Sequence, residues 1–269
     1  MIPKLDGVID SHCHVPVSGH GGRAPREPAD DVLSRARAAG VRGFVVVGVG
    51  ETTLEARDAI GLAQRHPDVV ASVGVHPHDA RLCDDTMVDE LRALARDPRV
   101  AAVGEIGLDF HYDHSPRDQQ RAVFRRFVGV ARELGKPIVI HTRSAGQEVL
   151  EILEQEGARD LGGVIHCFSE DLPFARRALD LGFDLSFSGI VTFKTATAIH
   201  EVGRFVPKER YLVETDAPYL APVPLRGKLC EPAYVVYTAR HLAELRGVAP
   251  EDVARESSDN ARRRFAGLG

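Results

Sequence analysis

The stretch from Val100 to His141 decides the fold of this chain, because it holds one complete strand–helix–strand unit. It opens with VAAVGE (100–105), continues with RDQQRAVFRRFVGVAREL (117–134) and closes with PIVIH (137–141). In the middle segment apolar residues recur every three or four positions, which predicts an amphipathic helix. The two flanking runs are almost continuously apolar, as strands are when both faces of their sheet are buried. The order strand, helix, strand predicts a parallel βαβ unit.

The same alternation runs along the whole chain. The expected strands are Val8–Asp10, Phe44–Val49, Val69–Val73, Val100–Gly104, Pro137–His141, Gly163–His166, Asp184–Phe187 and Tyr211–Thr215. Between and after them lie the helical patterns Asp31–Ala39, Leu54–His66, Val88–Arg96, Arg117–Leu134, Gln147–Glu156, Phe174–Leu181, Ala196–Phe205 and Pro232–Gly247, then a shorter one near Glu251–Ser257. The Gly- and Pro-rich segment Pro16–Pro28 is expected to be a long loop after the first strand.

Eight such units in 269 residues predict an α/β protein, a (β/α)8 TIM barrel that forms a single domain over residues 1–269. The alternative is an open doubly wound sheet. Neither a GxGxxG nor a GxxxxGK[ST] motif occurs, so the sequence supports no dinucleotide site and no P-loop.

Composition excludes several classes of protein. Apolar residues make up 43% and charged residues 27% of the chain, which is typical of a globular protein rather than a disordered one. A net charge of −5 argues against a broad basic surface for coating DNA, so any nucleic acid must be held locally. No apolar run approaches the roughly 20 residues of a membrane span. Without a recognisable secretory signal, and with four scattered cysteines (Cys13, Cys83, Cys167, Cys230), the chain is expected to be cytoplasmic, with free thiols.

Histidines and carboxylates fall at the expected strand ends. His12 and His14 follow the first strand, His76 follows the third, Glu105 ends the fourth, His141 the fifth and His166 the sixth, and Asp216 follows the eighth. In a parallel barrel these ends meet on the face where active sites lie. One such histidine is ordinarily a hydrogen-bonded core or rim residue, but the set as a whole indicates a site for a divalent metal such as zinc, manganese or cobalt.

The pair His12 and His14 is the strongest element of this pattern. In an extended segment residues i and i+2 point the same way, so both imidazoles can reach one ion. Cys13 then points to the opposite side, where we expect it to be a small buried apolar residue.

Seven blocks of sequence carry a family resemblance. They are Asp10-Ser-His-Cys-His14, Gly74-Val-His-Pro77, Gly104-Glu-Ile-Gly-Leu-Asp109, Val139-Ile-His-Thr-Arg143, His166-Cys-Phe-Ser169, Glu214-Thr-Asp-Ala-Pro-Tyr-Leu220, and Ala221-Pro-Val-Pro-Leu-Arg-Gly227 leading into Glu231-Pro232. In this order, over essentially the whole chain, they resemble the signatures of the TatD family of metal-dependent deoxyribonucleases. That family belongs to the amidohydrolase-like metal-dependent hydrolases and has a TIM-barrel fold.

The resemblance implies two divalent metal ions per chain, which could be zinc, manganese or magnesium. His12, His14 and Asp216 would hold one ion and His141 and His166 the other, with Glu105 bridging them where related barrels use a carbamylated lysine. Glu105 and Asp216 would be catalytic, the latter as general base. His76 would contact substrate or support a ligand, and Arg143 and Arg226 would hold a phosphate through two hydrogen bonds each.

The chain departs from the family pattern at Val15-Pro16, at Leu225 and at Cys230. We expect Cys230 or Glu231 to be the N-cap of the last long helix, because Pro232 is favoured in a first helical turn. Asp109 is expected to orient a ligand histidine, and Tyr112, Asp113 and His114 to line the mouth of the barrel. The remaining histidines are expected to be solvated, and these are His20, His66, His78, His111, His200 and His241, with His114 where it does not line the mouth.

The function that these expectations favour is a metal-dependent DNase. A hydroxide activated by two metals would cleave phosphodiester bonds of DNA, in a 3′–5′ exonuclease or apurinic-site reaction, on single-stranded DNA or 3′ ends. The alternative is that the same centre hydrolyses an ester, amide or lactone of a small molecule, or a D-aminoacyl-tRNA ester. A non-enzymatic metal-binding or scaffold protein is disfavoured, because a structural metal needs no open mouth with two metal sites.

Overall fold

One eight-stranded sheet forms the centre of the protein. The computed structural model describes residues 2–15, 17 and 27–269, so the expected loop Pro16–Pro28 lies mostly outside the described residues. The strands follow one another in chain order, and each consecutive pair is parallel. They are β1 (Val8–Cys13), β2 (Val41–Gly48), β3 (Val69–Val73), β4 (Val100–Asp109), β5 (Ile138–Arg143), β6 (Gly163–Ile165), β7 (Phe183–Phe187) and β8 (Tyr211–Val213).

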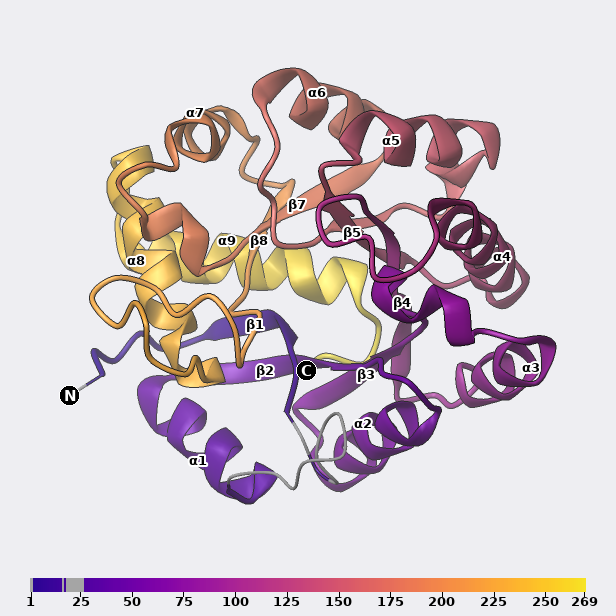
Figure 1. The fold of residues 1–269 in the computed structure, drawn as a ribbon. Helices are drawn as coiled ribbons and strands as arrows, with labels where there is room; N and C mark the ends of the chain where they lie inside the picture. Colours follow the sequence, from indigo (N-terminus) through magenta and orange to yellow (C-terminus); the bar gives the residue numbers. More distant parts are fainter. Residues whose placement is uncertain (1, 16, 18–26) are drawn as a thin grey trace.

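The helices form an outer ring around the sheet (Figure 1). They are α1 (Ala29–Ala39), α2 (Leu54–Arg65), α3 (Asp85–Leu94), α4 (Arg117–Leu134), α5 (Gly146–Gln155), α6 (Leu172–Asp180), α7 (Thr197–Phe205), α8 (Val235–Arg246) and α9 (Pro250–Arg264). Short 3₁₀ helices lie between them at η1 (Pro77–Leu82), η2 (Ala158–Asp160), η3 (Gly189–Thr192) and η4 (Pro232–Tyr234). This arrangement confirms the predicted (β/α)8 barrel.

Hydrogen bonds between β1 and the segment that follows β8 close the barrel. The Asp216 N–H donates to the His12 carbonyl at 3.0 Å, and the His14 N–H donates to the Ala217 carbonyl at 2.8 Å. The buried carboxylate of Asp10 accepts from the backbone N–H of Thr215 at 2.9 Å and from its hydroxyl at 2.6 Å. Closure therefore fixes the first histidine pair relative to Asp216.

Apolar side chains fill the barrel below the mouth. One buried cluster takes single residues from most strands and three from the C-terminal segment, and its members are Ile9, Val45, Val70, Ala101, Ala102, Val139, Val164, Leu212, Ala261, Phe265 and Leu268. Figure 1 shows α9 lying across the barrel beside β1 and β8. Burying one side chain such as Phe265 contributes about 2 kcal/mol.

The C-terminal helix is longer than expected. The sequence predicted a short helix near Glu251–Ser257, whereas α9 continues to Arg264. Its last turn is rich in arginine, which resembles a solvated end. In the structure Arg264 instead donates to the fully buried carboxylate of Asp184 in β7 at 2.8 Å. This partner is 80 residues away in the chain, so no local pattern indicates it.

Strand ends also differ from the expected ones. Strand β1 extends to Cys13, β4 to Asp109 and β5 to Arg143, so that His12, Glu105 and His141 lie within strands rather than at or beyond their ends. Strands β6 and β8 stop at Ile165 and Val213, before His166 and Thr215. The strand ends were predicted from where the apolar runs stop. In the structure β4 and β5 stay paired beyond that point, through polar residues, as far as Asp109 opposite Arg143.

The capping prediction is wrong for Cys230, whereas Glu231, the other expected residue, is the N-cap position of η4, which runs directly into α8. Helix α8 begins at Val235, and Glu231 precedes η4 without a side-chain capping bond. Cys230 is 3% exposed, and its sulfur lies 3.9 Å from the Thr215 carbonyl. The 3₁₀ turn between Pro232 and Tyr234 separates Cys230 from the helix, so this thiol packs against the loop after β8.

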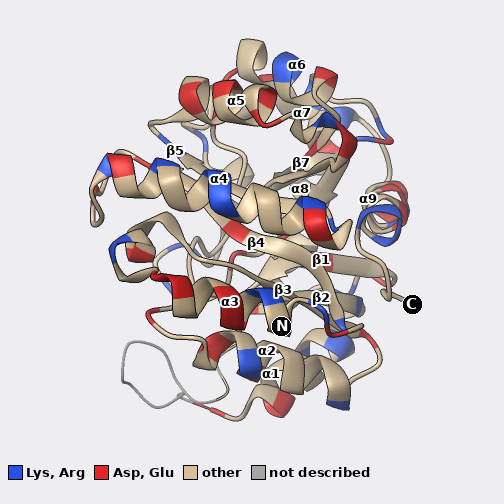
Figure 2. Cartoon of the chain, turned by 90° about the vertical axis from the view of Figure 1, so that its right-hand side faces the viewer, with Lys and Arg blue, Asp and Glu red and all other residues tan. Residues whose placement is uncertain are grey.

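The outer helices carry charges of both signs. Figure 2 shows acidic and basic residues interspersed along α3 and α4. Arg121 and Arg125 of α4, for example, pair with Glu148 and Glu156. Among the described residues, every helix is too short or too polar to cross a membrane.

A close approach of β4 and β5 gives a test of this packing. Gly107 has φ +146°, and a Cβ there would lie 2.0 Å from the His141 carbonyl oxygen. Gly107→Ala should therefore lower the free energy of unfolding by about 1–3 kcal/mol. Gly129→Ala is the matched control, because that glycine lies inside α4 with open space around its Cβ position. It should raise the free energy of unfolding by about 0.5–1 kcal/mol. Denaturant unfolding of both variants measures this, and a Gly107→Ala protein as stable as the wild type would contradict it.

Candidate metal centre

The first histidine pair converges as expected. The Nε2 atoms of His12 and His14 lie 3.3 Å apart, and His12 is 1% exposed. Cys13 points the other way, is fully buried, and places its sulfur 3.6 Å from the Val45 carbonyl. The extended backbone of β1 therefore delivers two imidazoles to the mouth and one thiol to the packing beneath it.

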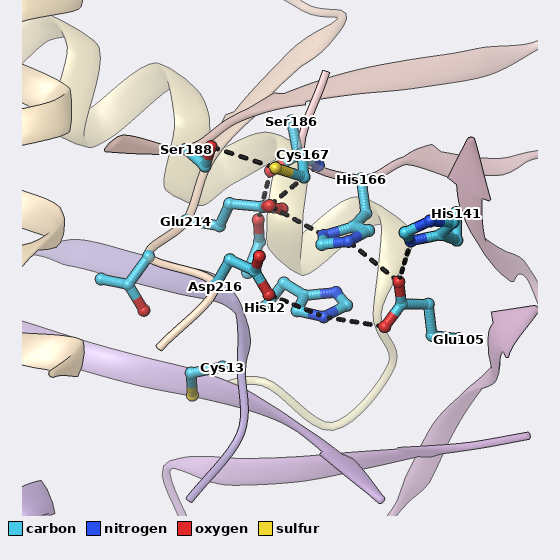
Figure 3. Close-up of polar contacts among 12 residues, drawn as sticks. His12, Cys13, Glu105, His141, His166, Cys167, Ser186, Ser188, Glu214 and Asp216 are labelled. Atoms are coloured by element: carbon cyan, nitrogen blue, oxygen red, sulfur yellow. Dashed lines mark hydrogen bonds and ion pairs between the residues drawn. The ribbon is translucent and has the colours of Figure 1, made fainter. Parts of the chain in front are cut away.

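Glu105 contacts several histidines of the polar cluster at the barrel mouth, and Figure 3 shows its contacts with His12, His141 and His166 as dashed lines. Its Oε2 lies 3.5 Å from His12 Nε2 and 3.9 Å from His14 Nε2. Its Oε1 lies 2.7 Å from His141 Nδ1 and 3.0 Å from His166 Nε2. The two carboxylate oxygens thus face two different pairs of imidazoles.

Asp216 completes the group around β1. Its Oδ1 lies 3.6 Å from His14 Nε2 and 3.8 Å from His12 Nε2. The residue has φ +56°, a left-handed conformation that is uncommon outside glycine. Its N–H is bonded to His12, so this backbone conformation holds the carboxylate toward the histidine pair.

Two further carboxylates orient the histidines of β5 and of the β6 end. Glu214 Oε1 lies 2.8 Å from His166 Nδ1 and also accepts the N–H of Cys167 at 2.8 Å. Asp109 Oδ2 lies 3.3 Å from His141 Nε2, which is the role expected for it. Each imidazole thus has one nitrogen directed at Glu105 and the other at a supporting carboxylate. Such partners fix ring orientation and tautomer in metal sites.

His76 contributes a different kind of group. Its Nδ1 accepts the backbone N–H of His78 at 3.2 Å, which leaves the hydrogen of the neutral imidazole on Nε2. That Nε2 lies 3.6 Å from Glu105 Oε1 and 3.3 Å from His141 Nδ1. Burial lowers the pKa of His76 well below its usual range, so the ring is neutral. His76 therefore presents an N–H donor to the cluster.

Charges within the cluster balance one another. Burial alone would raise the pKa of Glu105. The neighbouring histidines, His166 foremost, outweigh burial and hold the pKa of Glu105 well below its usual range. Burial alone would lower the pKa of His166, but Glu214 and Glu105 raise it well above its usual range. In the metal-free protein the stable state is therefore a carboxylate beside an imidazolium.

The donor set fits divalent metal ions. Three groups of possible ligand atoms each lie within 4.8 Å of one another, and they are His12 with His14 and Asp216, His12 with His166 and Glu214, and His76 with Glu105 and His141. Buried His12 Nδ1 and Glu214 Oε2 have no hydrogen-bond partner among the described residues. Neutral imidazole and carboxylate oxygen are ligands that zinc and manganese accept.

The two arginines expected to hold phosphate lie apart from each other. Arg143 is the last residue of β5, and its guanidinium carbon lies 4.5 Å from the centre of the Tyr112 ring. Arg226 lies 4.4 Å from the Phe193 ring centre, and it lines a cavity of about 580 Å³ between η3 and α8. Arg143 lies on β5, the strand that also carries His141, whereas Arg226 lies on no strand.

Several residues that support the cluster were not predicted from the sequence. Glu214 belongs to one of the family-like blocks but was given no role, although an acidic residue directly after a buried strand is a usable signal. His78 was expected to be solvated, whereas it lies 2.9 Å from Asp109 Oδ2. His66 and His200 are likewise partly buried and bonded, to Asp30 and to the Val191 carbonyl. His20 lies outside the described residues.

A parallel barrel whose mouth gathers imidazoles and carboxylates is the architecture of the barrel metal-dependent hydrolases. The family model "TatD related DNase" matches residues 9–266. The chain belongs to the TatD family, and it is a metal-dependent hydrolase.

Individual relatives agree with this assignment. The metal-dependent hydrolase YcfH of Escherichia coli K12, itself uncharacterized, is 44% identical over 262 residues, which cover 96% of this chain and 95% of that protein. The 3′-5′ ssDNA/RNA exonuclease TatD of Salmonella typhimurium is 35% identical over 88% of this chain and 92% of its own length. The crystal structure of YjjV, a TatD homologue from E. coli, superposes with a TM-score of 0.86 at 28% identity and covers 96% of this chain and 97% of its own.

The raised pKa of His166 predicts how the stability of the metal-free protein depends on pH. Because the folded-state pKa lies well above the usual 6.5, the stabilising contribution of the imidazolium is fully present below about pH 6.5. It is lost as the pH rises through the raised pKa. The melting temperature of EDTA-treated protein should therefore fall as the pH rises above about 6.5, and it should fall less in His166→Gln. Equal falls in both proteins would show that His166 is not the titrating group.

Proposed function

We propose that this hydrolase is a deoxyribonuclease that cleaves phosphodiester bonds at a centre of two metal ions. The observation that carries the proposal is the position of Glu105, whose two oxygens face two separate pairs of imidazoles. A carboxylate placed in this way suits a bridge between two ions. The relative named as an ssDNA/RNA exonuclease supports nucleic acid as the substrate.

In this proposal His12, His14 and Asp216 would hold one ion, His141 and His166 would hold the other, and Glu105 would be a ligand of both. Zinc, manganese and magnesium are the candidate ions. Bound there, the ions would lower the pKa of a water molecule and offset negative charge on the phosphate. Glu214 and Asp109 keep the His166 and His141 rings in the orientation that this ligand set requires.

Asp216 serves as the general base in the proposed reaction. Its side chain is 13% exposed, so it lies at the mouth where a water molecule can reach it. Its Oδ1 is directed toward His12 and His14 and can accept a proton there. The backbone bond from Asp216 to His12 keeps the carboxylate in place during the transfer.

His76 and Arg143 contact the substrate phosphate. The bond from the His78 N–H makes His76 Nε2 a donor, and burial keeps the ring neutral, which suits a phosphate oxygen as its acceptor. Arg143 has no carboxylate partner within the described ranges, and the Tyr112 ring supports its guanidinium. Its fork of N–H donors is therefore free to bind phosphate through two hydrogen bonds.

Single-stranded DNA and 3′ ends are the proposed substrate forms. Outside the mouth, many basic residues are paired with carboxylates, as in the pairs of Arg121 and Arg125 on α4. With a net charge of −5, the chain lacks the excess of cations that broad duplex binding requires. A strand end that enters the mouth needs only local contacts.

The test is nucleotide release from 3′-ended single-stranded DNA with added magnesium, manganese, zinc or cobalt, beside a panel of ester, amide and lactone substrates. We expect metal-dependent cleavage of the DNA. Asp216→Asn should lower the turnover rate by about 10²-fold or more with little change in melting temperature. Arg143→Lys should weaken phosphodiester cleavage while the metal content stays the same, because lysine keeps the charge but loses the fork.

Each contrary result has a definite meaning. Hydrolysis of an ester or amide without cleavage of DNA would replace the nuclease proposal with the alternative substrate class. Near wild-type turnover in metal-loaded Asp216→Asn would remove that residue from the mechanism. An equal loss by Arg143→Lys on a neutral ester would show that Arg143 acts on the structure rather than on phosphate.

A further inference from the structure

The cavity of about 580 Å³ between η3 and α8 is lined by more basic than acidic side chains. Lys194, Arg226 and Arg240 line it, whereas Glu244 is its one acidic lining residue. The Glu244 side chain is 77% exposed and lies 3.6 Å from His241 Nδ1, so three cationic side chains stand against one acidic group. The balance of charge favours an anionic ligand.

The cations that line the cavity have donors to spare. Among the described residues, neither Lys194 nor Arg226 has a carboxylate partner. Arg240 uses Nη2 to donate to the Lys4 carbonyl at 2.8 Å, and within the described residues it likewise has no carboxylate partner. Unpaired donors of this kind around a cavity suit phosphate oxygens.

Aromatic rings accompany these charges. The Phe193 ring lies beneath the Arg226 guanidinium, with 4.4 Å between the guanidinium carbon and the ring centre, so the cation is positioned without a carboxylate that would compete with phosphate. Tyr237 also lines the cavity. Cations beside aromatic rings are the combination that binds single-stranded nucleic acid without sequence preference.

Two segments of the chain lead from the proposed metal centre to the wall of the cavity. Ser188, whose hydroxyl lies 3.2 Å from the sulfur of Cys167, leads through η3 to Thr192 in the cavity wall. The loop that begins at Asp216 leads to Val223 on the other side. The Val223 N–H donates to the Thr192 hydroxyl at 2.9 Å and joins the two segments. Both segments begin beside the centre and end in the cavity wall, so the cavity borders the same loops, after β7 and β8, as the mouth of the barrel.

We propose that this cavity is a second nucleotide subsite, which binds phosphate and base of the substrate strand away from the cleaved bond. The inference rests on the proposed nuclease function and adds a requirement for length. A dinucleotide fills the metal centre alone, whereas a decamer also reaches Lys194 and Arg226. Longer single strands are therefore the better substrates.

The experiment compares a dinucleotide with a single-stranded decamer on the metal-loaded enzyme. The double variant Lys194→Gln/Arg226→Gln should lower the ratio of kcat/KM for the decamer to kcat/KM for the dinucleotide by about tenfold. The slope of log KM for the decamer against log salt concentration should decrease by about 1.4, because each of the two cations that neutralises a phosphate of a single strand adds about 0.7 to it. Arg204→Gln is the matched control, because Arg204 lies near the end of α7, away from the barrel mouth, and it should keep the wild-type ratio and slope.

Other outcomes separate this proposal from the function on which it rests. If the wild type cleaves DNA and the double variant shows the same kcat/KM ratio and the same salt slope as the wild type, the subsite proposal is wrong and the nuclease proposal stands. If the wild type cleaves no DNA, the nuclease proposal fails. The subsite is then tested by binding: the fluorescence anisotropy of a labelled decamer gives its affinity for the metal-loaded wild type and double variant, and the slope of log affinity against log salt concentration should be smaller in magnitude for the variant. Failure of the wild type to bind the decamer at all would overturn both.

Discussion

The buried carboxylate of Glu105 is the constraint around which the site is arranged. An ionised carboxylate with 2% exposure carries a large desolvation cost unless charged or polar partners surround it. Those partners are imidazoles from β1, β5 and the end of β6, each within hydrogen-bonding or ion-pairing distance. A chain can bring groups from three such distant strands to one point only if the strand register of the barrel is correct. The site around Glu105 can therefore form only in the correctly folded barrel.

Closure of the barrel does as much for the site as the central carboxylate. The bonds between Asp10 and Thr215, and between His12 and Asp216, join the first strand to the segment after the last. The residues on either side of this seam are the proposed ligands of one ion and the proposed general base. Loosening the seam would separate them even if every side chain were kept.

Sequence reasoning succeeded where chemistry and spacing are local. The spacing of His12 and His14 predicted that both rings face the mouth and that Cys13 faces away, and the apolar runs located all eight strands. It failed where a residue is defined by a distant partner. Glu214 is recognised by a bond to His166, 48 residues away in the chain. The polar continuation of β4 depends on pairing with β5, and the arginines at the end of α9 depend on buried Asp184.

The most direct measurement of the central claim is a metal count on purified protein, by atomic emission and by anomalous scattering from manganese-loaded crystals. The proposal predicts two ions per wild-type chain, one on each side of Glu105. It also predicts that Glu105→Ala lowers occupancy at both positions, whereas His141→Ala empties chiefly one. A Glu105→Ala protein that retains two tightly bound ions would contradict the bridge and, with it, the proposed two-metal centre.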